Sequence, residues 1–349
     1  MTSSQPQPEE LQIAMLGASR VGKTSLLAAI YSQFANIIGA VGQLELIPDV
    51  ASNTSALLAE RLAELTTLAD EIVVKPEKGT RGTADVREFI FSIKERGSEN
   101  GLRLRFVDYP GGYLGADSTK EEKTFVINLL KSSDAVLIAI DAAALMETDT
   151  RNRSWHGAIN RSQQITDLFK FAYNNLTSPR LVILCPVKCE KYMLPFQDLR
   201  RKPEDGDASP NNLQARVEYE YRNLISYFQT QPTNIATVIT PVQTTGCVFY
   251  ARIEYEIDDV NQKSPRFRFV RRGGRRAEYN PKDSEQPLLW LLPFLLQASI
   301  LKRPWYKKFV LWVLDLDKNI KSSLKLLEGK RKRSDGFKLI QGEHLVEIK

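Results

Sequence analysis

The stretch LQIAMLGASRVGKT, residues 11–24, decides how the rest of the chain is interpreted. Its second half follows the pattern G-x-x-x-x-G-K-[ST], which is typical of a phosphate-binding P-loop. Gly17 and Gly22 allow a tight turn that brings the backbone close to an anion, and a helix expected over residues 25–34 adds the positive end of its dipole. A strand-like apolar run precedes the motif and a helical run follows it. This context favours a nucleotide site over a chance glycine loop.

The pattern gives the residues of the loop separate tasks. Lys23 is expected to reach the β- and γ-phosphates, and the hydroxyl of Thr24 is expected to ligate Mg²⁺. The residues expected to line the bound nucleotide here are Gly17, Ala18, Ser19, Arg20, Val21, Gly22, Lys23, Thr24 and Ser25.

The composition sets limits on the class of protein. The chain has 349 residues, of which 42% are hydrophobic and 26% charged, so it can bury one large core or two smaller ones. Three cysteines are too few for a disulfide framework and fit a reducing compartment, so we expect a cytoplasmic protein. Residues 1–10 are polar, lack the apolar core of a secretory signal and are expected to form a disordered tail. No apolar run reaches transmembrane length.

Strand and helix patterns alternate along the chain. We expect strands at 11–16, 86–93, 102–107, 135–140, 181–184 and 236–239, and helices at 25–34, 52–72, 118–132, 159–175 and 213–228. The strands at 86–93 and 102–107 suit an antiparallel hairpin at a sheet edge, whereas the later runs are apolar throughout, as in buried parallel strands. The order predicts an α/β P-loop NTPase three-layer fold with a mostly parallel sheet. Residues 11–250 would form this domain, with a helical insert at about 51–74 and a loop insert at about 191–212.

A strand that ends in Asp108 is followed by Tyr-Pro-Gly, which gives the sequence D-x-x-G. An acid at this place can hold Mg²⁺ through water, and the N–H of Gly111 can then sense the γ-phosphate. The alternative is an Asp that makes an ordinary turn at a strand end. No Asp-Glu pair follows the apolar strand at 135–140, so the glutamate base of many P-loop ATPases is missing. A small-nucleoside kinase that uses ATP stays open, although it would not need the hairpin before Asp108.

At this point the chain resembles the translation-factor-like and Ras-like class of GTPases, over residue 11 to about 246. Residues 17–24 look like the first guanine-nucleotide motif, and residues 108–111 look like the third. The sequence CPVKCE, residues 185–190, resembles a degenerate N-K-x-D, and residues 244–246 resemble the loop near S-A-K. The long insert, the D-x-P-G-G sequence and the C-terminal extension look like the divergent bacterial double-GTPase group. Members of that group are associated with multi-component conflict or signalling systems. The resemblance implies GTP or GDP and Mg²⁺ as ligands.

Two departures from the class concern the base and the hydrolytic water. Val187 stands where the class has Asn, and Glu190 stands where it has the Asp that accepts two hydrogen bonds from guanine. Lys188, Glu190 and Thr245 are expected to face the base, and the alternative for the charged pair is a solvated loop. Gly112 stands where many members carry a water-positioning Gln. We therefore expect slow hydrolysis unless a partner or another segment supplies the missing group, and Arg20 is an internal candidate.

A switch protein of this class also needs a Thr that closes on Mg²⁺ and the γ-phosphate. Thr80 and Thr83 lie in the loop before residue 86, and either could serve. The expected catalytic residues are Lys23, Thr83 and Gly111, and the expected metal ligands are Thr24, Asp108 and Thr80. A protein partner would recognise the conformation of the loops that respond to the γ-phosphate. A non-hydrolysing nucleotide-binding adaptor is the competing hypothesis.

Residues 251–349 are expected to form a basic extension. Strand patterns at 248–257 and 267–270 suggest a hairpin, and 286–300 and 305–327 look helical. From Leu301 onward there are 13 Lys and Arg against 6 Asp and Glu, a net of +7. The basic helix could contact an anionic membrane peripherally, or it could pack on the core with a solvated basic face. Nucleic-acid binding is disfavoured because stacking platforms are not evident.

Overall fold

A computed structural model gives the fold of the chain. It describes residues 10–41, 44–67, 71–74, 85–95, 97, 101–115, 117–148, 154–195, 197–198, 200–202, 205–206, 208–257, 263–273, 278–300, 325 and 327–347. Thr80, Thr83, the tail at 1–9 and nearly all of the helix expected at 305–327 lie outside the described residues.

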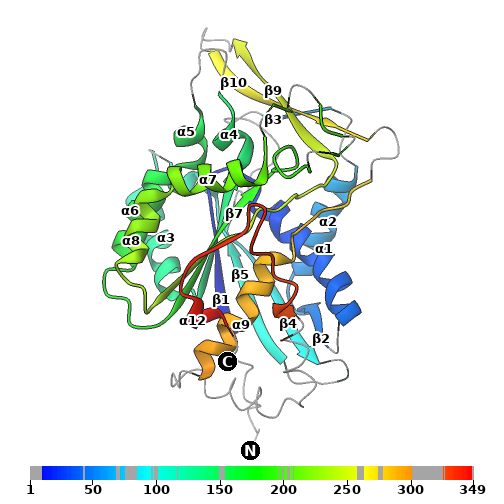
Figure 1. Ribbon diagram of the computed structural model, residues 1–349. Coiled ribbons are helices and arrows are strands. Elements are labelled where there is room, and N and C mark those ends of the chain that lie inside the picture. Colours follow the sequence, from blue (N-terminus) through cyan, green and yellow to red (C-terminus); the bar gives the residue numbers. More distant parts are fainter. Residues whose placement is uncertain are drawn as a thin grey trace, which may run out of the picture.

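Eight strands of the described chain form one sheet in the order β11-β8-β7-β6-β1-β5-β4-β2 (Figure 1). The inner strands β5, β1, β6, β7 and β8 run parallel, whereas β4, β2 and β11 each pair antiparallel with a neighbour. The strands are β1 (Glu10–Leu16), β2 (Leu44–Pro48), β4 (Arg87–Glu95), β5 (Gly101–Asp108), β6 (Ala135–Asp141), β7 (Arg180–Val187), β8 (Ile235–Ile239) and β11 (Lys338–Gln341). The expected α/β fold with a mostly parallel sheet is confirmed.

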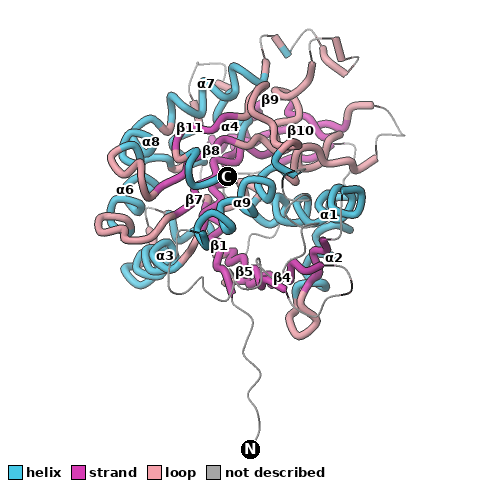
Figure 2. Tube along the Cα trace, turned by 60° about the horizontal axis from the view of Figure 1, so that its bottom comes forward, coloured by secondary structure: helices cyan, strands magenta, loops and turns pink. Residues whose placement is uncertain are grey.

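Helices cover both faces of this sheet (Figure 2). Along β1, Ile13 and Met15 point to one face, and Ala14 and Leu16 point to the other, because strand side chains alternate. The helices on the first face are α1 (Lys23–Val41), α2 (Thr54–Thr66), α9 (Gln286–Ile300) and α12 (Glu343–Val346). Those on the second are α3 (Lys120–Ser132), α6 (Ser162–Ala172), α7 (Pro210–Glu220) and α8 (Arg222–Gln229). The short helices η1 (Gly111–Leu114), α4 (Ala142–Met146) and α5 (His156–Asn160) lie in the connections.

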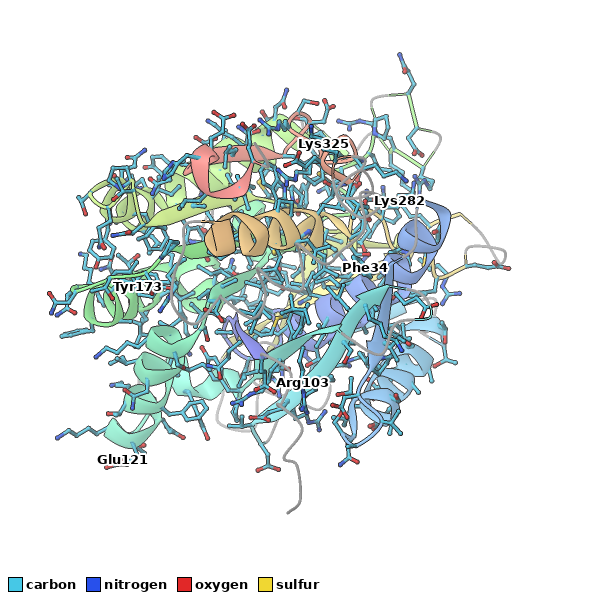
Figure 3. All side chains as sticks on the ribbon, turned by 90° about the horizontal axis from the view of Figure 1, so that it is seen from below. Phe34, Arg103, Glu121, Tyr173, Lys282 and Lys325 are labelled. Atoms are coloured by element: carbon cyan, nitrogen blue, oxygen red, sulfur yellow. The ribbon has the colours of Figure 1, made fainter. Side chains whose placement is uncertain are left out.

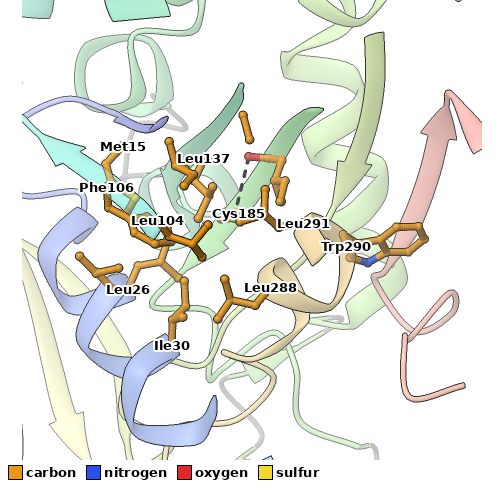
Figure 4. Close-up of a cluster of buried hydrophobic side chains, with 14 of the residues drawn as sticks. Met15, Leu26, Ile30, Leu104, Phe106, Leu137, Cys185, Leu288, Trp290 and Leu291 are labelled. Atoms are coloured by element: carbon orange, nitrogen blue, oxygen red, sulfur yellow. Dashed lines mark hydrogen bonds between the residues drawn. The ribbon is translucent and has the colours of Figure 1, made fainter. Parts of the chain in front are cut away.

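Apolar side chains from distant parts of the sequence fill the first face. Figure 4 shows Leu26 and Ile30 of α1 beside Leu104 of β5 and Leu288 of α9, all of them buried. Phe34 of α1 and Tyr173, next to α6, are both fully buried and belong to the clusters on the two different faces of the sheet (Figure 3). Apolar side chains are buried on both faces of the sheet, and their burial stabilises the order of its strands. The strand order in turn sets the positions of the loops at the carboxyl ends of the parallel strands.

A second, smaller sheet lies above the ends of the parallel strands (Figure 1). Among the described residues it has three antiparallel strands in the order β3-β10-β9, which are β3 (Glu71–Val74), β9 (Val248–Ile257) and β10 (Lys263–Arg271). The hairpin expected after residue 247 is therefore confirmed, and the helix expected at 286–300 is present as α9.

Three expected helices are shortened or interrupted within their predicted ranges. The helix expected at 52–72 ends at Thr66, and residues 71–74 form β3 instead, because their β-branched run finds a pairing partner in β10. The helix expected at 159–175 is interrupted at Arg161, whose left-handed φ of 53° stops the helical repeat. The helix expected at 213–228 breaks at Tyr221, whose buried ring packs edge-on against His156.

The C-terminal segment returns to the main sheet. Strand β11 pairs antiparallel with β8. The guanidinium of Arg331 is buried, donates to the carbonyls of Leu289 and Val346, and lies 4.8 Å from the ring centroid of Trp290. Part of the basic run at 330–333 thus contacts protein groups. Among the described helices, none combines the length and the apolar character that crossing a bilayer requires.

Candidate functional site

The P-loop connects β1 to α1 through three residues with positive φ. Gly17 has φ 150°, Arg20 has φ 66° and Gly22 has φ 116°. A Cβ on Gly17 would lie 2.9 Å from Cγ2 of Val21 and 3.0 Å from the carbonyl oxygen of Ala139, so a side chain would not fit there. Loops of this kind direct successive backbone N–H groups into an anion-binding concavity. Nothing in the sequence indicates that Arg20 would take the left-handed conformation.

Lys23 is buried at the centre of this loop. Its Nζ donates to the carbonyl of Gly17 at 3.0 Å and to that of Ala18 at 3.5 Å, and it lies 3.7 Å from Oδ1 of Asp108. Burial lowers the pKa of the ammonium, and the nearby Asp108 carboxylate partly opposes that effect. A phosphate oxygen bound here would replace neutral carbonyl acceptors of Lys23 by a charged acceptor.

Thr24 and Asp108 lie side by side at the ends of adjacent elements. Thr24 lies in the first turn of α1, and Asp108 ends β5 opposite Met15 of β1. The Thr24 hydroxyl donates to Oδ2 of Asp108 at 2.6 Å. Because that bond uses the only hydrogen of the hydroxyl, its oxygen lone pairs stay available to a cation. A hydroxyl and one carboxylate, completed by phosphate oxygens and water, fit the hard oxygen ligands that Mg²⁺ prefers. No larger group of metal-ligating side chains exists among the described residues.

The segment after Asp108 touches the P-loop directly. A Cβ on Gly111 would lie 2.0 Å from the backbone N of Ser19 and 2.3 Å from the carbonyl carbon of Ala18, so only glycine fits. In contrast, a Cβ on Gly112 would meet nothing within 4 Å. The first two residues of η1 therefore have different environments. Gly111 packs against the backbone of the P-loop, whereas Gly112 borders open space.

Arg161 contacts η1, the short helix that follows Asp108, and this contact was not predicted from the sequence. Its guanidinium donates to the carbonyl of Leu114, the last residue of η1, at 3.1 Å. Its left-handed backbone separates α5 from α6. A non-glycine residue in that conformation carries strain that functional sites often hold. The signal in the sequence is too weak to find, because the contact joins positions far apart in the chain.

On the other side of the P-loop, Lys188 links three elements. Its Nζ donates to the carbonyl of Arg20 at 2.9 Å and to Oδ2 of Asp141 at 2.5 Å. Asp141 ends β6, and its Oδ1 caps α4 by accepting from the N–H of Ala144. Lys188 therefore lies against the phosphate loop, and its contact with the base stays a prediction. Asp141 was missed, although an acid at the carboxyl end of a parallel strand is a usable signal.

Glu190 and Thr245 also lie together, in the segments that follow β7 and β8. One oxygen of the buried Glu190 carboxylate, Oε1, accepts from the N–H of Thr245 at 2.8 Å, the Thr245 hydroxyl at 2.8 Å and the N–H of Gly246 at 3.2 Å. Burial raises the pKa of Glu190, and the hydrogen bonds from Thr245 and Gly246 reduce the rise. The structure thus brings Lys188, Glu190 and Thr245 to one side of the P-loop, while their contact with a base stays a prediction.

We expect guanine binding to weaken as the pH falls toward the raised pKa of Glu190. The neutral carboxyl predominates below that pKa, and it loses an acceptor that guanine N–H groups require. Fluorescence titration of a labelled GDP across mildly acidic to neutral pH measures the effect. The Glu190→Gln variant should bind more weakly at neutral pH and show a flatter profile. Parallel pH profiles for the two proteins would contradict the assignment of Glu190 to the base.

The comparisons with known proteins agree with this geometry. The family Double-GTPase 2 matches residues 12–216, which include the P-loop, Asp108 to Gly111, and Lys188 to Glu190. Thr245 lies beyond the match. A search of curated proteins gave no match. Because the family match spans more than half of the 349 residues, the chain belongs to the Double-GTPase 2 family, which implies that it binds guanine nucleotide.

Proposed function

We propose that the protein is a Mg²⁺-dependent guanine-nucleotide switch that hydrolyses GTP slowly and requires a partner for full activity. The observation that carries this proposal is the contact of Gly111 with the backbone of Ser19, because it joins the acid-ended strand to the phosphate loop. A γ-phosphate that draws on the Gly111 N–H would shift η1 and the residues after it. A protein partner would read that shift, in a multi-component signalling or conflict system.

Each residue has a defined part in this proposal. Lys23 binds the β- and γ-phosphates, Thr24 and Asp108 hold Mg²⁺, and Lys188 and Glu190 bind the base. Mg²⁺ would supply neutralisation of the phosphate charge. Thr80 or Thr83 would close on the metal and the γ-phosphate. Supporting the proposal, the Thr24 hydroxyl is already oriented by Asp108, so little rearrangement is needed before a cation binds.

The direct test is the nucleotide that the protein carries and its dependence on Mg²⁺. Nucleotide extracted from the purified protein should be GDP or GTP by chromatography. Added EDTA should speed the release of labelled GDP by roughly tenfold or more, since removal of the metal leaves the phosphate charge less neutralised. Bound adenine nucleotide, or release that EDTA leaves unchanged, would refute the proposal.

We expect the Gly112→Gln substitution to raise single-turnover GTP hydrolysis by roughly a hundredfold, which is the lower range for a positioned proton-transfer group. The open space beside Gly112 admits a side chain, so the fold should tolerate the change. Rapid mixing with radiolabelled GTP measures the rate. Gly112→Ala serves as the control, because it adds bulk without an amide and should leave the rate unchanged.

The competing function is a nucleotide-binding adaptor that does not hydrolyse GTP, and Gly112 favours it. The two candidates differ in one measurement. A switch enzyme releases phosphate in a single turnover, faster with its neighbouring-gene products present, whereas an adaptor retains intact GTP under both conditions. Half-buried Arg20 is the internal residue that could supply charge for hydrolysis, so Arg20→Ala should slow any measured rate.

A further inference from the structure

The lysine of the P-loop lies over a buried aromatic ring. Nζ of Lys23 is 5.6 Å from the ring centroid of Tyr109, within the range of about 6 Å at which a cation is attracted to a π face. Tyr109 follows Asp108, at a position that the pattern D-x-x-G leaves open. Its ring is fully buried in the apolar cluster on the second face of the sheet, whereas Lys23 belongs to α1. The phosphate loop and the segment after β5 are therefore joined through these two side chains.

Two further rings fix the plane of Tyr109. Tyr113 of η1 stacks on it with a centroid separation of 5.9 Å and an interplanar angle of 29°. Phe125 of α3 meets both rings edge-on, at 6.2 Å from Tyr109 and 5.9 Å from Tyr113. Stacked and edge-to-face contacts are favourable arrangements for aromatic pairs. Three rings packed in this way restrict each other's rotation, so the face of Tyr109 keeps its position relative to Lys23.

The ring gives the lysine something that apolar packing alone does not provide. The Lys23 side chain is 5% exposed, and a buried cation is costly unless nearby groups compensate for the lost water. Its ammonium donates to the carbonyls of Gly17 and Ala18, and the Asp108 carboxylate lies 3.7 Å away. The negative face of an aromatic ring adds an attraction that occupies none of these acceptors.

The contact joins a cation to a neutral ring. Burial raises the pKa of Tyr109 well above that of an ordinary tyrosine, and the charge of Asp108 acts in the same direction, whereas the backbone of Gly17 opposes them. The Tyr109 hydroxyl therefore stays protonated at neutral pH. Because Tyr109 is fully enclosed by protein, a phosphate must approach Lys23 from another direction, so the ring and the phosphate do not compete.

We infer that Tyr109 is a positioning residue for the nucleotide, whose ring holds the ammonium of Lys23 at the place where the phosphates bind. In the free protein, Nζ of Lys23 is then in place before the nucleotide arrives. The apparent affinity for a ligand falls in proportion to the fraction of the protein that has the competent conformation. This assignment rests on the proposed function, because it concerns the lysine that binds the β- and γ-phosphates there.

The electrostatics of the ring can be changed at nearly constant shape. We expect Tyr109→Phe to bind GDP as the wild type does, because the ring is retained. Singly, doubly and triply fluorinated phenylalanine, incorporated at position 109 of the full chain, withdraws electron density from the π face in steps. The Kd for GDP, measured by isothermal titration with Mg²⁺, should rise at each step and reach roughly ten times the wild-type value for the triple fluorination. Equal affinities across the series would overturn the inference.

A double-mutant cycle separates the positioning of Lys23 from the filling of the core. Tyr109→Leu removes the π face and should weaken GDP binding roughly tenfold. In a Lys23→Ala background the same substitution should have no further effect, since the cation is absent. An equal decrease in both backgrounds would show that the ring acts on the fold instead, which overturns the inference. If Tyr109→Leu does not fold, the fluorinated series decides alone, because it keeps the ring.

The matched control is Phe169 of α6. It is buried in the same apolar cluster as Tyr109 and packs edge-on against the rings of Tyr173 and Phe228. The same fluorinated residues at position 169 perturb a core ring that belongs to α6 rather than to the segment after β5, and they should leave the Kd for GDP unchanged. A rise in Kd as large as that at position 109 would contradict a specific role for Tyr109.

The wild-type protein distinguishes failure of the inference from failure of the proposed function. Wild-type protein that binds GDP with Mg²⁺, together with a flat fluorination series, means that the positioning role fails and the proposed function stands. Failure of the wild-type chain to bind GDP would instead refute the proposed function.

Discussion

Replacing Lys23 by alanine is expected to weaken the binding of GTP and GDP by roughly a hundredfold or more. Its ammonium is the buried cation of the P-loop, and hydrogen bonds to charged groups contribute about 1.5–3 kcal/mol each. Removing its hydrogen bonds to two phosphate groups at once would give roughly that change in Kd. Isothermal titration of nucleotide-free protein with GDP in the presence of Mg²⁺ measures it.

The control for this experiment is Lys131→Ala, which removes an exposed lysine from α3 and should bind GDP as the wild type does. Thermal unfolding of both variants shows whether the fold is retained, because Lys23 also lies 3.7 Å from the buried Asp108 carboxylate. A Lys23→Ala protein that is folded and binds GDP within a few-fold of the wild type would contradict the assignment of Lys23 to the phosphates.

Replacing Asp205 by alanine is expected to destabilise the attachment of the smaller sheet by about 3–5 kcal/mol, the cost of leaving one partner of a buried ion pair alone. Both side chains of the Asp205–Arg272 pair are buried, at 2.5 Å and 2.9 Å between their polar atoms. Burial is the largest single influence and opposes the ionised form of Asp205, but the bonds and charge of Arg272, the N–H of Lys202 and the charge of Lys191 together lower its pKa. Equilibrium unfolding in urea measures the decrease in stability.

A matched control comes from the same loop. Asp198 pairs with Arg200, whose guanidinium lies over the ring of Phe249 in β9, but both partners are partly exposed. Such surface pairs contribute about 0–1 kcal/mol, so Asp198→Ala should change the unfolding free energy little. Equal decreases from Asp198→Ala and Asp205→Ala would contradict the structural importance of the buried pair. The pKa of Asp205 is lower in the folded protein than in the unfolded chain, so its carboxylate stabilises the fold at pH values above the pKa of an ordinary Asp. This contribution to the unfolding free energy should disappear as the pH falls through the lowered pKa of Asp205.

The predictable parts of the fold are those that local chemistry dictates. The sequence from Gly17 to Thr24 admits few conformations, and the structure has a P-loop there. The alternation of Phe89, Phe91 and Ile93 predicts one buried face, and β4 has it. Runs such as 181–184 are apolar on both faces because helices cover both sides of the sheet.

The parts that sequence reasoning missed depend on contacts between distant residues. Leucine periodicity extended the expected helix past Thr66, since nothing local shows that β10 will pair with residues 71–74. Strand β11 is short and follows a basic run, so it has no pattern of its own. At the candidate site, Asp141 and Arg161 act through partners 47 residues away in each case, Lys188 and Leu114. Such pairs become visible only when the chain is folded.

The pairing of β11 with β8 has a consequence for synthesis on the ribosome. Strand β8 ends at Ile239, and its edge receives β11 only after about a hundred further residues have been translated. Until then the growing polypeptide exposes an unpaired strand edge, which is prone to non-native association. Nascent chains halted shortly after Ile239 should therefore recruit chaperones that bind such edges.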